Sequence, residues 1–169
     1  MKPMRPFLLA TVILTFGPLA QAAKPPTAAE IEELRTVVYK MWTAWDSLDP
    51  SKVAEFYSKD PNNVFFDISP LKFQGWSAYA DGAAKALVNM ASAKWEPTGD
   101  FKVIKEGNLA VTTLTMNVVF TSKSGTSNRS SVRDTGVWEK QGGKWVMLHQ
   151  HASIPSGGPQ PPSAQKGKK

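Results

Sequence analysis

The sequence predicts an α+β fold, in which about three helices pack on the concave face of a cone-shaped, curved antiparallel sheet. In the first half of the chain, apolar residues recur at the spacing of amphipathic helices. In the second half they alternate, and only short turns separate the alternating stretches. Because short links join antiparallel neighbours, the second half is expected to form a meander, with the helices layered against it.

The first helix is expected to begin after Thr27 and to run to about Ser47. Thr27 and Glu30 have the spacing of a capping box, in which two side chains accept hydrogen bonds from the free amides of a helix start. Apolar residues then follow at intervals of three and four. They are Ile31, Leu34, Val38, Met41, Trp42 and Trp45.

A second, shorter helix is expected to begin at Asp49 and Pro50, since this pair is typical of an N-cap followed by proline in the first turn. Its inner face would carry Val53, Phe56 and Tyr57. A compact strand over 64–68 and a loop over 69–75 follow. A third helix is expected over 76–91, with apolar residues on one side.

Four successive strands are expected over 101–104, 109–122, 128–140 and 144–154. The last two are joined by Gly142-Gly143, and adjacent glycines readily adopt the positive φ angles of a tight turn. In a regular final strand, His149 and His151 would share one face with Trp145 and Met147. The opposite face would carry Val146, Leu148 and Ala152.

The two ends of the chain predict its location. Residues 1–22 are typical of a secretory signal peptide, with Lys2 and Arg5 before a short apolar run and a small-x-small site ending at Ala22. Cleavage near Ala22 would place the protein in the periplasm or outside the cell, with no membrane contact afterwards. An uncleaved N-terminal anchor is the alternative. Residues 156–169 are rich in Pro, Gly and Lys and are expected to be disordered, which leaves 23–155 as one domain.

Composition excludes several kinds of site. The formal net charge is +6, but much of the excess lies in the signal and the tail, so the domain itself is near neutral. Nucleic-acid binding is not expected, because it needs a basic stripe that neutralises phosphates. The chain has no cysteine, so it can form neither disulfides nor a thiolate metal site.

The end of the chain resembles the SnoaL-like branch of the nuclear transport factor 2-like superfamily. The resemblance covers roughly 28–155 and extends to ketosteroid isomerase-like proteins and to the association domain of calmodulin-dependent protein kinase II. It is carried by the pattern Arg133-x-Thr135-x-Val137-Trp138, Gly143-Lys144-Trp145, His149-x-His151 and Ser153-x-Pro155.

That resemblance implies a cystatin-like, NTF2-like cone with a pocket inside it and a homodimer formed through the sheet. No cofactor is expected. The family includes isomerases, cyclases and dehydratases, together with binding and assembly domains that have no catalytic activity. A shared fold therefore does not decide the chemistry.

The candidate catalytic residues are Asp67, His149 and His151. Histidines in the pocket could carry protons or donate to a ligand oxygen, since their pKa lies near neutrality. The alternative is that at least one is a hydrogen-bonded core residue. Asp67 ends an apolar strand, where burial would raise its pKa, although it could instead cap its own turn. Asp46 and Asp49 compete with it for the role of the family's early aspartate, and a metal held by the histidines and Asp67 would lack an assured third ligand.

The candidate ligand-binding residues are Arg133, Trp42, Trp76, Tyr79 and Asn117. Arg133 could grip a carboxylate with two parallel hydrogen bonds, or it could be a paired surface residue. The aromatic residues lie at helical spacings typical of a core, but some could wall an apolar cavity. Asn117 interrupts an apolar strand and could face the same cavity.

These observations predict an exported domain that binds a small, partly apolar, carboxylate- or carbonyl-bearing molecule. Cofactor-independent acid–base chemistry of the isomerase, dehydratase or cyclase kind would follow if the pocket is catalytic. The alternative is a non-catalytic module for oligomerisation or interaction. The sequence has neither a nucleophile elbow nor a glycine-rich phosphate loop.

Overall fold

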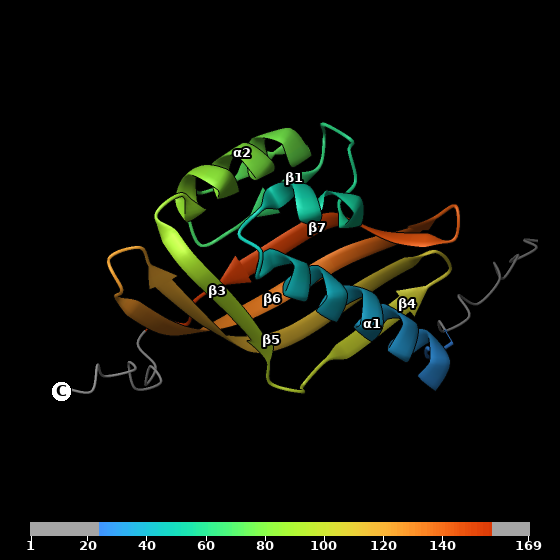
Figure 1. Ribbon diagram of the computed structural model, residues 1–169. Coiled ribbons are helices and arrows are strands. Elements are labelled where there is room, and N and C mark those ends of the chain that lie inside the picture. Colours follow the sequence, from blue (N-terminus) through green and yellow to red (C-terminus); the bar gives the residue numbers. More distant parts are fainter. Residues whose placement is uncertain (1–23, 157–169) are drawn as a thin grey trace, which may run out of the picture.

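The computed structural model describes residues 24–156, in which two α-helices lie on the concave side of a curled, open seven-stranded sheet (Figure 1). The expected signal peptide lies outside the described residues, as does the expected tail beyond Ser156. Within the described part, no helix is both long enough and apolar enough to span a membrane. The α+β prediction is confirmed, whereas the prediction of three helices is wrong.

Helix α1 (Ala28–Trp45) begins as the sequence predicts. The Thr27 hydroxyl accepts a hydrogen bond from the Glu30 amide at 3.3 Å, and the Thr27 amide donates to the Glu30 carboxylate at 2.8 Å. Both halves of the capping box are therefore present. The face turned to the sheet is buried and carries Leu34, Val38, Met41, Trp42 and Trp45.

The predicted second helix consists of two single 3-10 turns, η1 (Pro50–Lys52) and η2 (Ala54–Phe56). Asp49 is the N-cap, and its carboxylate accepts from the Ser51 amide at 2.9 Å. The segment stays short because the chain becomes extended at Tyr57, which forms a bridge with Met147 of the sheet. The cap was predicted correctly, but pairing with the sheet ends the helix.

Helix α2 (Gly75–Leu87) ends four residues earlier than 91, the predicted end of the third helix. The chain then forms β3 (Met90–Pro97), a strand that the sequence did not predict. β3 pairs with β5 (Leu109–Ser122) over most of its length, so backbone pairing overrides the helical spacing around Met90.

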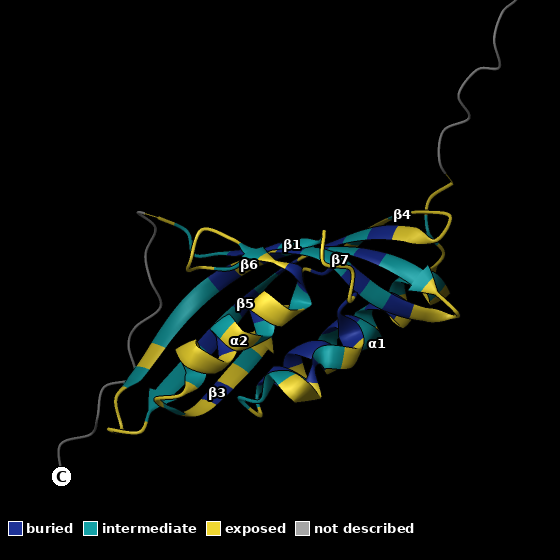
Figure 2. Ribbon diagram, turned by 90° about the horizontal axis from the view of Figure 1, so that it is seen from above, coloured by how far each residue is buried: buried dark blue, intermediate teal, exposed yellow. Residues whose placement is uncertain are grey.

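The sheet has the strand order β2-β1-β7-β6-β5-β3, and β4 (Lys102–Glu106) pairs with the first part of β5. β1 (Val64–Phe66) runs parallel to β7 (Lys144–Ser153), so the sheet is mixed rather than wholly antiparallel. β2 (Phe73–Gln74) and β6 (Ser127–Gln141) complete it. Seen from above, the long strands curl around the two helices (Figure 2).

A β-bulge in β7 decides which residues of that strand face inward. Trp138 pairs with Met147 and Val137 pairs with His149, so Leu148 is an extra residue. Before the bulge, Trp145 and Met147 are buried, and after it Gln150 and Ala152 are buried. The prediction that His149 and His151 share the inward face with Trp145 is therefore wrong. One extra residue moves every later side chain to the other face.

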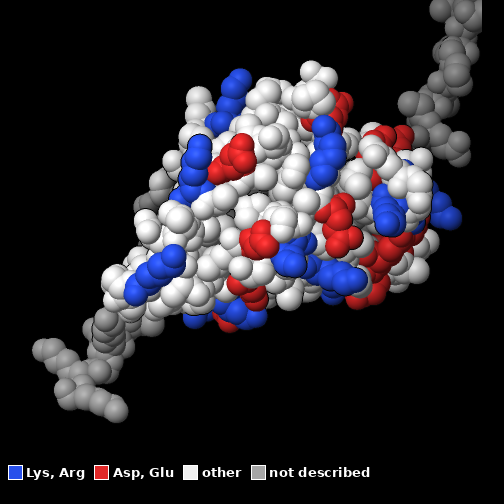
Figure 3. Space-filling view, turned by 45° about the horizontal axis from the view of Figure 1, so that its top comes forward, with Lys and Arg blue, Asp and Glu red and all other residues white. Residues whose placement is uncertain are grey.

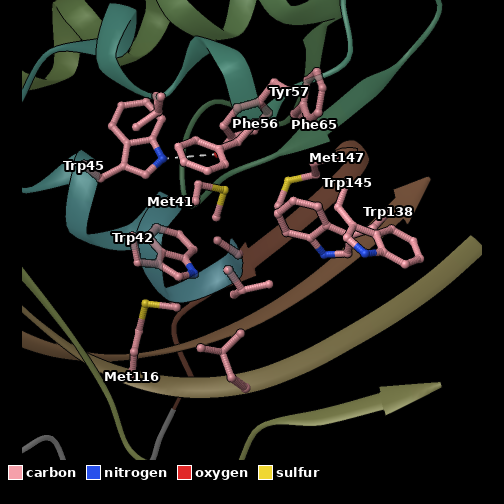
Figure 4. Packing of buried hydrophobic residues seen from close by; sticks show 14 of the residues in the cluster. Met41, Trp42, Trp45, Phe56, Tyr57, Phe65, Met116, Trp138, Trp145 and Met147 are labelled. Carbon is pink, nitrogen blue, oxygen red and sulfur yellow. Dashed lines mark hydrogen bonds between the residues drawn. The ribbon is translucent and has the colours of Figure 1, made fainter. Parts of the chain in front are cut away.

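The core lies between α1 and the strands β5 to β7, where large side chains from both layers meet (Figure 4). Trp138 is fully buried, and its indole N–H donates to the Thr112 hydroxyl at 2.9 Å. Gly136 leaves room for this contact, because a Cβ there would lie 2.6 Å from the indole nitrogen. The hairpin glycines Gly142 and Gly143 have φ angles of 56° and 82°, as predicted.

Candidate active site

An apolar cavity of about 220 Å³ lies between the two helices and the sheet. Small residues of α2, Ala83 and Ala86, form part of its wall. Among the described residues that line it, Asp67 alone has a carboxyl group, and none is a lysine, arginine or histidine. Five of the other lining residues are aromatic, namely Trp42, Trp45, Tyr79, Trp95 and Phe120.

Asp67 is placed at the cavity by its position directly after β1. One carboxylate oxygen accepts from the Ile68 amide at 2.7 Å, and the other accepts from the Tyr79 hydroxyl at 3.3 Å. Burial raises the pKa of Asp67, and these two hydrogen bonds only partly oppose the rise. The carboxyl group therefore exchanges its proton closer to neutral pH than an exposed aspartate does.

A string of buried hydrogen bonds leads from Asp67 into the sheet. The Tyr79 hydroxyl lies 3.4 Å from the side-chain oxygen Oε1 of Gln150, so the single hydroxyl proton of Tyr79 can be donated to either Gln150 or Asp67. The Tyr57 hydroxyl donates to the same Gln150 oxygen at 2.9 Å, and it accepts from the Trp45 indole at 3.2 Å (Figure 4). Burial raises the pKa of both tyrosines, so they remain hydrogen-bond donors.

Asp134 lies at the far end of this string. The Gln150 amide nitrogen donates to one Asp134 oxygen at 2.8 Å, while the other oxygen is buried without a partner among the described residues. Burial raises the pKa of Asp134 to about 7, and the charge of Asp67 adds to the rise. The two carboxyl groups are thus linked through Gln150 and Tyr79.

The structure brings three of the predicted site residues to the cavity, namely Asp67, Trp42 and Tyr79. Trp76 is not among the residues that line it. Its ring stacks on Tyr57, with ring centroids 4.4 Å apart, and the Lys59 ammonium lies 4.4 Å from its centre. Trp76 therefore packs against Tyr57 and does not contact the cavity as a lining residue.

The two histidines lie outside the cavity. His149 is half-buried, with its Nδ1 atom 2.6 Å from the Val64 carbonyl oxygen. His151 is exposed and lines a shallow outer groove, and both imidazoles meet the Phe66 ring edge-on. The bulge in β7 turns them outward, so the prediction that they reach the pocket is corrected.

Arg133 and Asn117 also point away from the cavity. Arg133 is exposed on the outer face of β6, because its neighbours Val132 and Asp134 occupy the inward positions. Asn117 accepts a hydrogen bond from the Ser131 hydroxyl at 3.3 Å on the same outer face. The prediction that Arg133 binds a ligand carboxylate inside the pocket is therefore corrected.

The competing aspartates have other partners. Asp46 accepts hydrogen bonds from the Lys94 ammonium at 2.8 Å and from the Trp95 amide at 3.1 Å, and Asp49 caps η1. Of the three aspartates, Asp67 is therefore the one that lines the cavity. The described residues contain no group of three or more potential metal ligands. Neither histidine is among the described residues that line the inner cavity, although His151 and Asp67 both line the outer groove.

Sequence reasoning missed three residues of the string of hydrogen bonds, namely Tyr57, Asp134 and Gln150. Asp134 could have been found, because it alternates in phase with Val132 and Trp138, two inward residues of the same strand. Tyr57 was predicted only as a core residue. Gln150 could not have been assigned without the bulge, since regular alternation places it opposite the buried Trp145 and Met147.

Comparisons with known proteins agree with this architecture. The model of the SnoaL-like domain family matches residues 34–157. No curated protein matches the sequence.

Solved structures are similar to this chain over most of its length. An NTF2-like superfamily protein from Salmonella enterica serovar Typhimurium aligns with a TM-score of 0.69 and 18% identity, covering 75% of this chain and 91% of that one. A proposed dehydratase of the NTF2-like family from Streptomyces avermitilis aligns at 0.67 and 16%, covering 76% and 99%. A proposed calcium/calmodulin-dependent protein kinase II association domain from Xanthomonas campestris aligns at 0.67 and 21%, covering 82% and 99%. At these identities the similarity concerns the fold.

Proposed function

The chain belongs to the SnoaL-like domain family, and we propose that its inner cavity binds a small, partly apolar molecule without negative charge, a carbonyl compound in the simplest case. One observation carries this proposal. A single carboxyl group, that of Asp67, lies in an otherwise mostly apolar wall with five aromatic residues and is hydrogen-bonded to Tyr79. A mostly apolar pocket with few polar groups is the usual form of a small-molecule site.

The charge of the site argues against an anionic ligand. No basic residue is among the described lining residues, and Arg133 lies on the other face of the sheet. A carboxylate in the cavity would approach Asp67 without a compensating cation, which is costly in an apolar environment. Of the two ligand types that the sequence predicted, we therefore propose a carbonyl compound and not a carboxylate.

The proposed chemistry is proton transfer at Asp67. As a base, its carboxylate would take a proton from the carbon next to the ligand's carbonyl group. It would then return the proton at another position, as in an isomerase, or give it to a hydroxyl group that departs from the adjacent carbon as water, leaving a carbon–carbon double bond, as in a dehydratase. A raised pKa brings the carboxyl group closer to the pH at which such catalysis is efficient. The Streptomyces neighbour, named as a proposed dehydratase, shares this fold.

Binding is tested with acetophenone as the probe and benzoate as its negatively charged counterpart. Three tryptophans line the cavity, so their fluorescence is a suitable signal. We expect acetophenone to bind and benzoate not to bind. Ala83→Leu, which fills the cavity, should weaken acetophenone binding at least tenfold, whereas Ala84→Leu on the exposed side of α2 should not. Equal binding of the two probes would contradict the proposal.

Catalysis is tested by deuterium exchange into the methyl group of acetophenone in D₂O, followed by proton NMR. The unmodified protein should accelerate the exchange, and Asp67→Asn should lose the acceleration because an amide does not accept the proton. The control is the double variant His149→Ala/His151→Ala, which should retain it. Exchange that survives Asp67→Asn but not the histidine variant would overturn the assignment.

A second candidate function is a non-catalytic assembly module. Half-exposed aliphatic residues on the outer face of the sheet, among them Val111, Val119 and Val137, favour a homodimer formed through that face. A dimer is compatible with a catalytic cavity, so the exchange experiment separates the two candidates.

Export is a further part of the proposal, and mass spectrometry of the periplasmic protein should find Ala23 as its first residue.

A further inference from the structure

We infer that the ligand of the inner cavity carries a compact ammonium group, quaternary or tertiary, which lies against the aromatic walls near Asp67. This inference rests on the proposed function, since it specifies the chemical class of the ligand for the same cavity. It depends on two features, the aromatic rings that enclose the space and the balance of charge around it.

The aromatic rings of the wall come from several elements. Trp42 of α1 and Trp95 of β3 lie with ring centroids 4.7 Å apart, and Phe120 of β5 meets Trp95 edge-on at 5.3 Å. Trp45 and Tyr79 form a second pair, 6.1 Å apart. Aromatic faces attract cations, and cages of such rings recognise quaternary ammonium ligands.

The charge around the cavity is unbalanced. Asp67 lines it, and Asp134 is buried behind it at the end of the hydrogen-bonded string. No described lining residue is basic, and the nearby Lys94 is exposed and paired with Asp46. Two carboxyl groups without a buried cation make this region favourable for positive charge, and the effect is large because the surroundings are apolar.

An ammonium group on the ligand would favour proton transfer at Asp67. Burial disfavours the ionised carboxylate, and a positive charge beside it favours that form again. The ionised form is the one that can accept a proton from the ligand. A cationic ligand therefore favours the ionised form of Asp67 more than a neutral ligand of the same shape does.

The test compares choline with 3,3-dimethylbutan-1-ol, in which carbon replaces the ammonium nitrogen. The two molecules have nearly the same shape, so their affinities differ through charge. Tryptophan fluorescence and calorimetry should show choline binding roughly tenfold or more tightly than the alcohol. Equal affinity, or tighter binding of the alcohol, would overturn the inference.

Two variants locate the source of the preference. Asp67→Asn should reduce the preference for choline while leaving the affinity for the alcohol within about twofold. Phe120→Leu keeps the wall apolar but removes a ring, and it should also lower the preference, which provides a second readout if Asp67→Asn does not fold. Ala84→Leu is the control, and it should bind both molecules as the unmodified protein does. An unchanged preference in either wall variant, folded as judged by circular dichroism, contradicts the assignment to this cavity.

The outcomes separate this inference from the function on which it rests. If acetophenone and the alcohol bind but choline does not, the cavity is a site for neutral molecules and only the inference fails. If none of the three binds to the folded protein, the proposed function fails as well.

Discussion

The carboxyl groups of Asp67 and Asp134 differ in what they can do. Asp67 reaches the cavity and keeps a short hydrogen bond to a backbone amide. Asp134 is almost completely buried, and one of its oxygens has no partner within the described part of the chain. Asp67 can therefore exchange a proton with a ligand, while Asp134 mainly sets the charge and the hydrogen-bond direction behind it.

Asp134 predicts how stability depends on pH. In the folded protein its pKa is about 7, whereas in the unfolded chain it is near the ordinary value of 3.8. Between these values the folded state holds the proton more tightly, so the free energy of unfolding falls as pH rises from about 4 to about 7. Asp134→Asn removes this contribution. We expect the variant to be more stable than the unmodified protein by roughly 1–3 kcal/mol at pH 8.

Urea denaturation at a series of pH values measures this difference. At pH 4 the carboxyl group is protonated in the folded protein, so the variant and the unmodified protein should have similar stability there. That comparison is the internal control. A variant that is destabilised equally at pH 4 and pH 8 would show that Asp134 contributes through its hydrogen bond alone.

At the residue scale, the sequence predicted part of the site. Asp67 was found because it directly follows an apolar strand. Arg133 was misplaced by one position in an alternating strand, where Asp134 is the inward residue. A strand's alternation is visible in the sequence, but which of its two faces is buried depends on the layer packed against it.

At the element scale, the bulge at Leu148 decides the composition of the site. It turns Gln150 inward, where this residue joins Tyr57 to Asp134, and it turns the histidines outward. A regular strand would bring one histidine to the place of Gln150. Because of the bulge, the side chain at this position is the amide of Gln150 and not the imidazole of a histidine.

Deleting Leu148 tests this role. The deletion removes the extra residue, so β7 becomes a regular strand in which Gln150 still pairs with Gly136, points inward and keeps its hydrogen bonds. We expect a loss of about 1 kcal/mol in the free energy of unfolding, measured by urea denaturation. Gln150→Ala, which removes the hydrogen bonds to Tyr57 and Asp134, is the comparison and should lose roughly 3 kcal/mol. A loss in the deletion variant as large as that in Gln150→Ala would contradict the account.

Gly136 gives a second prediction at this scale. In Gly136→Ala, the new Cβ would lie 2.6 Å from the Trp138 indole nitrogen and 3.1 Å from the Thr112 hydroxyl, so the hydrogen bond between them must break or shift. We expect a loss of about 1–3 kcal/mol in the free energy of unfolding. Thr135→Ala, the neighbour on the outer face, should change it much less. A stable Gly136→Ala variant would mean that the core moves to make room.

The elements that the sequence predicted well are those with strong local signals. The capping box of α1 and the glycine hairpin between β6 and β7 both formed as expected. The second helix and the end of the third were wrong because strand pairing decided them, at the bridge of Tyr57 to Met147 and at β3. Such long-range pairing leaves little trace in local periodicity.

At the scale of the whole molecule, the curl of the sheet makes the cavity. The helices cover its concave side (Figure 2). The wall of the remaining space includes aromatic residues of both layers. On the face seen in Figure 3, basic and acidic side chains are interspersed. Asp134 is buried and Asp67 is partly buried, so most of the polarity of the site lies below the surface.

The proposed dimer belongs to this scale. Val137 is half-buried on the outer face of β6, opposite the buried Trp138 and Asp134. If that face joins two copies, Val137→Asp should convert the dimer into a monomer, because it would bring two like charges into the interface. Light scattering after size exclusion measures the mass. Ala84→Asp on α2 is the control and should leave the dimer intact, and a monomeric unmodified protein at micromolar concentration would contradict the proposal.

The most direct test of the central claim is a crystal structure of the protein soaked with 4-bromoacetophenone, with the anomalous signal of bromine locating the ligand. We predict a bromine peak inside the cavity walled by Trp42 and Trp95, with the carbonyl group of the ligand turned towards Asp67 and Tyr79. A peak in the outer groove beside His151, with the inner cavity empty, would contradict the account.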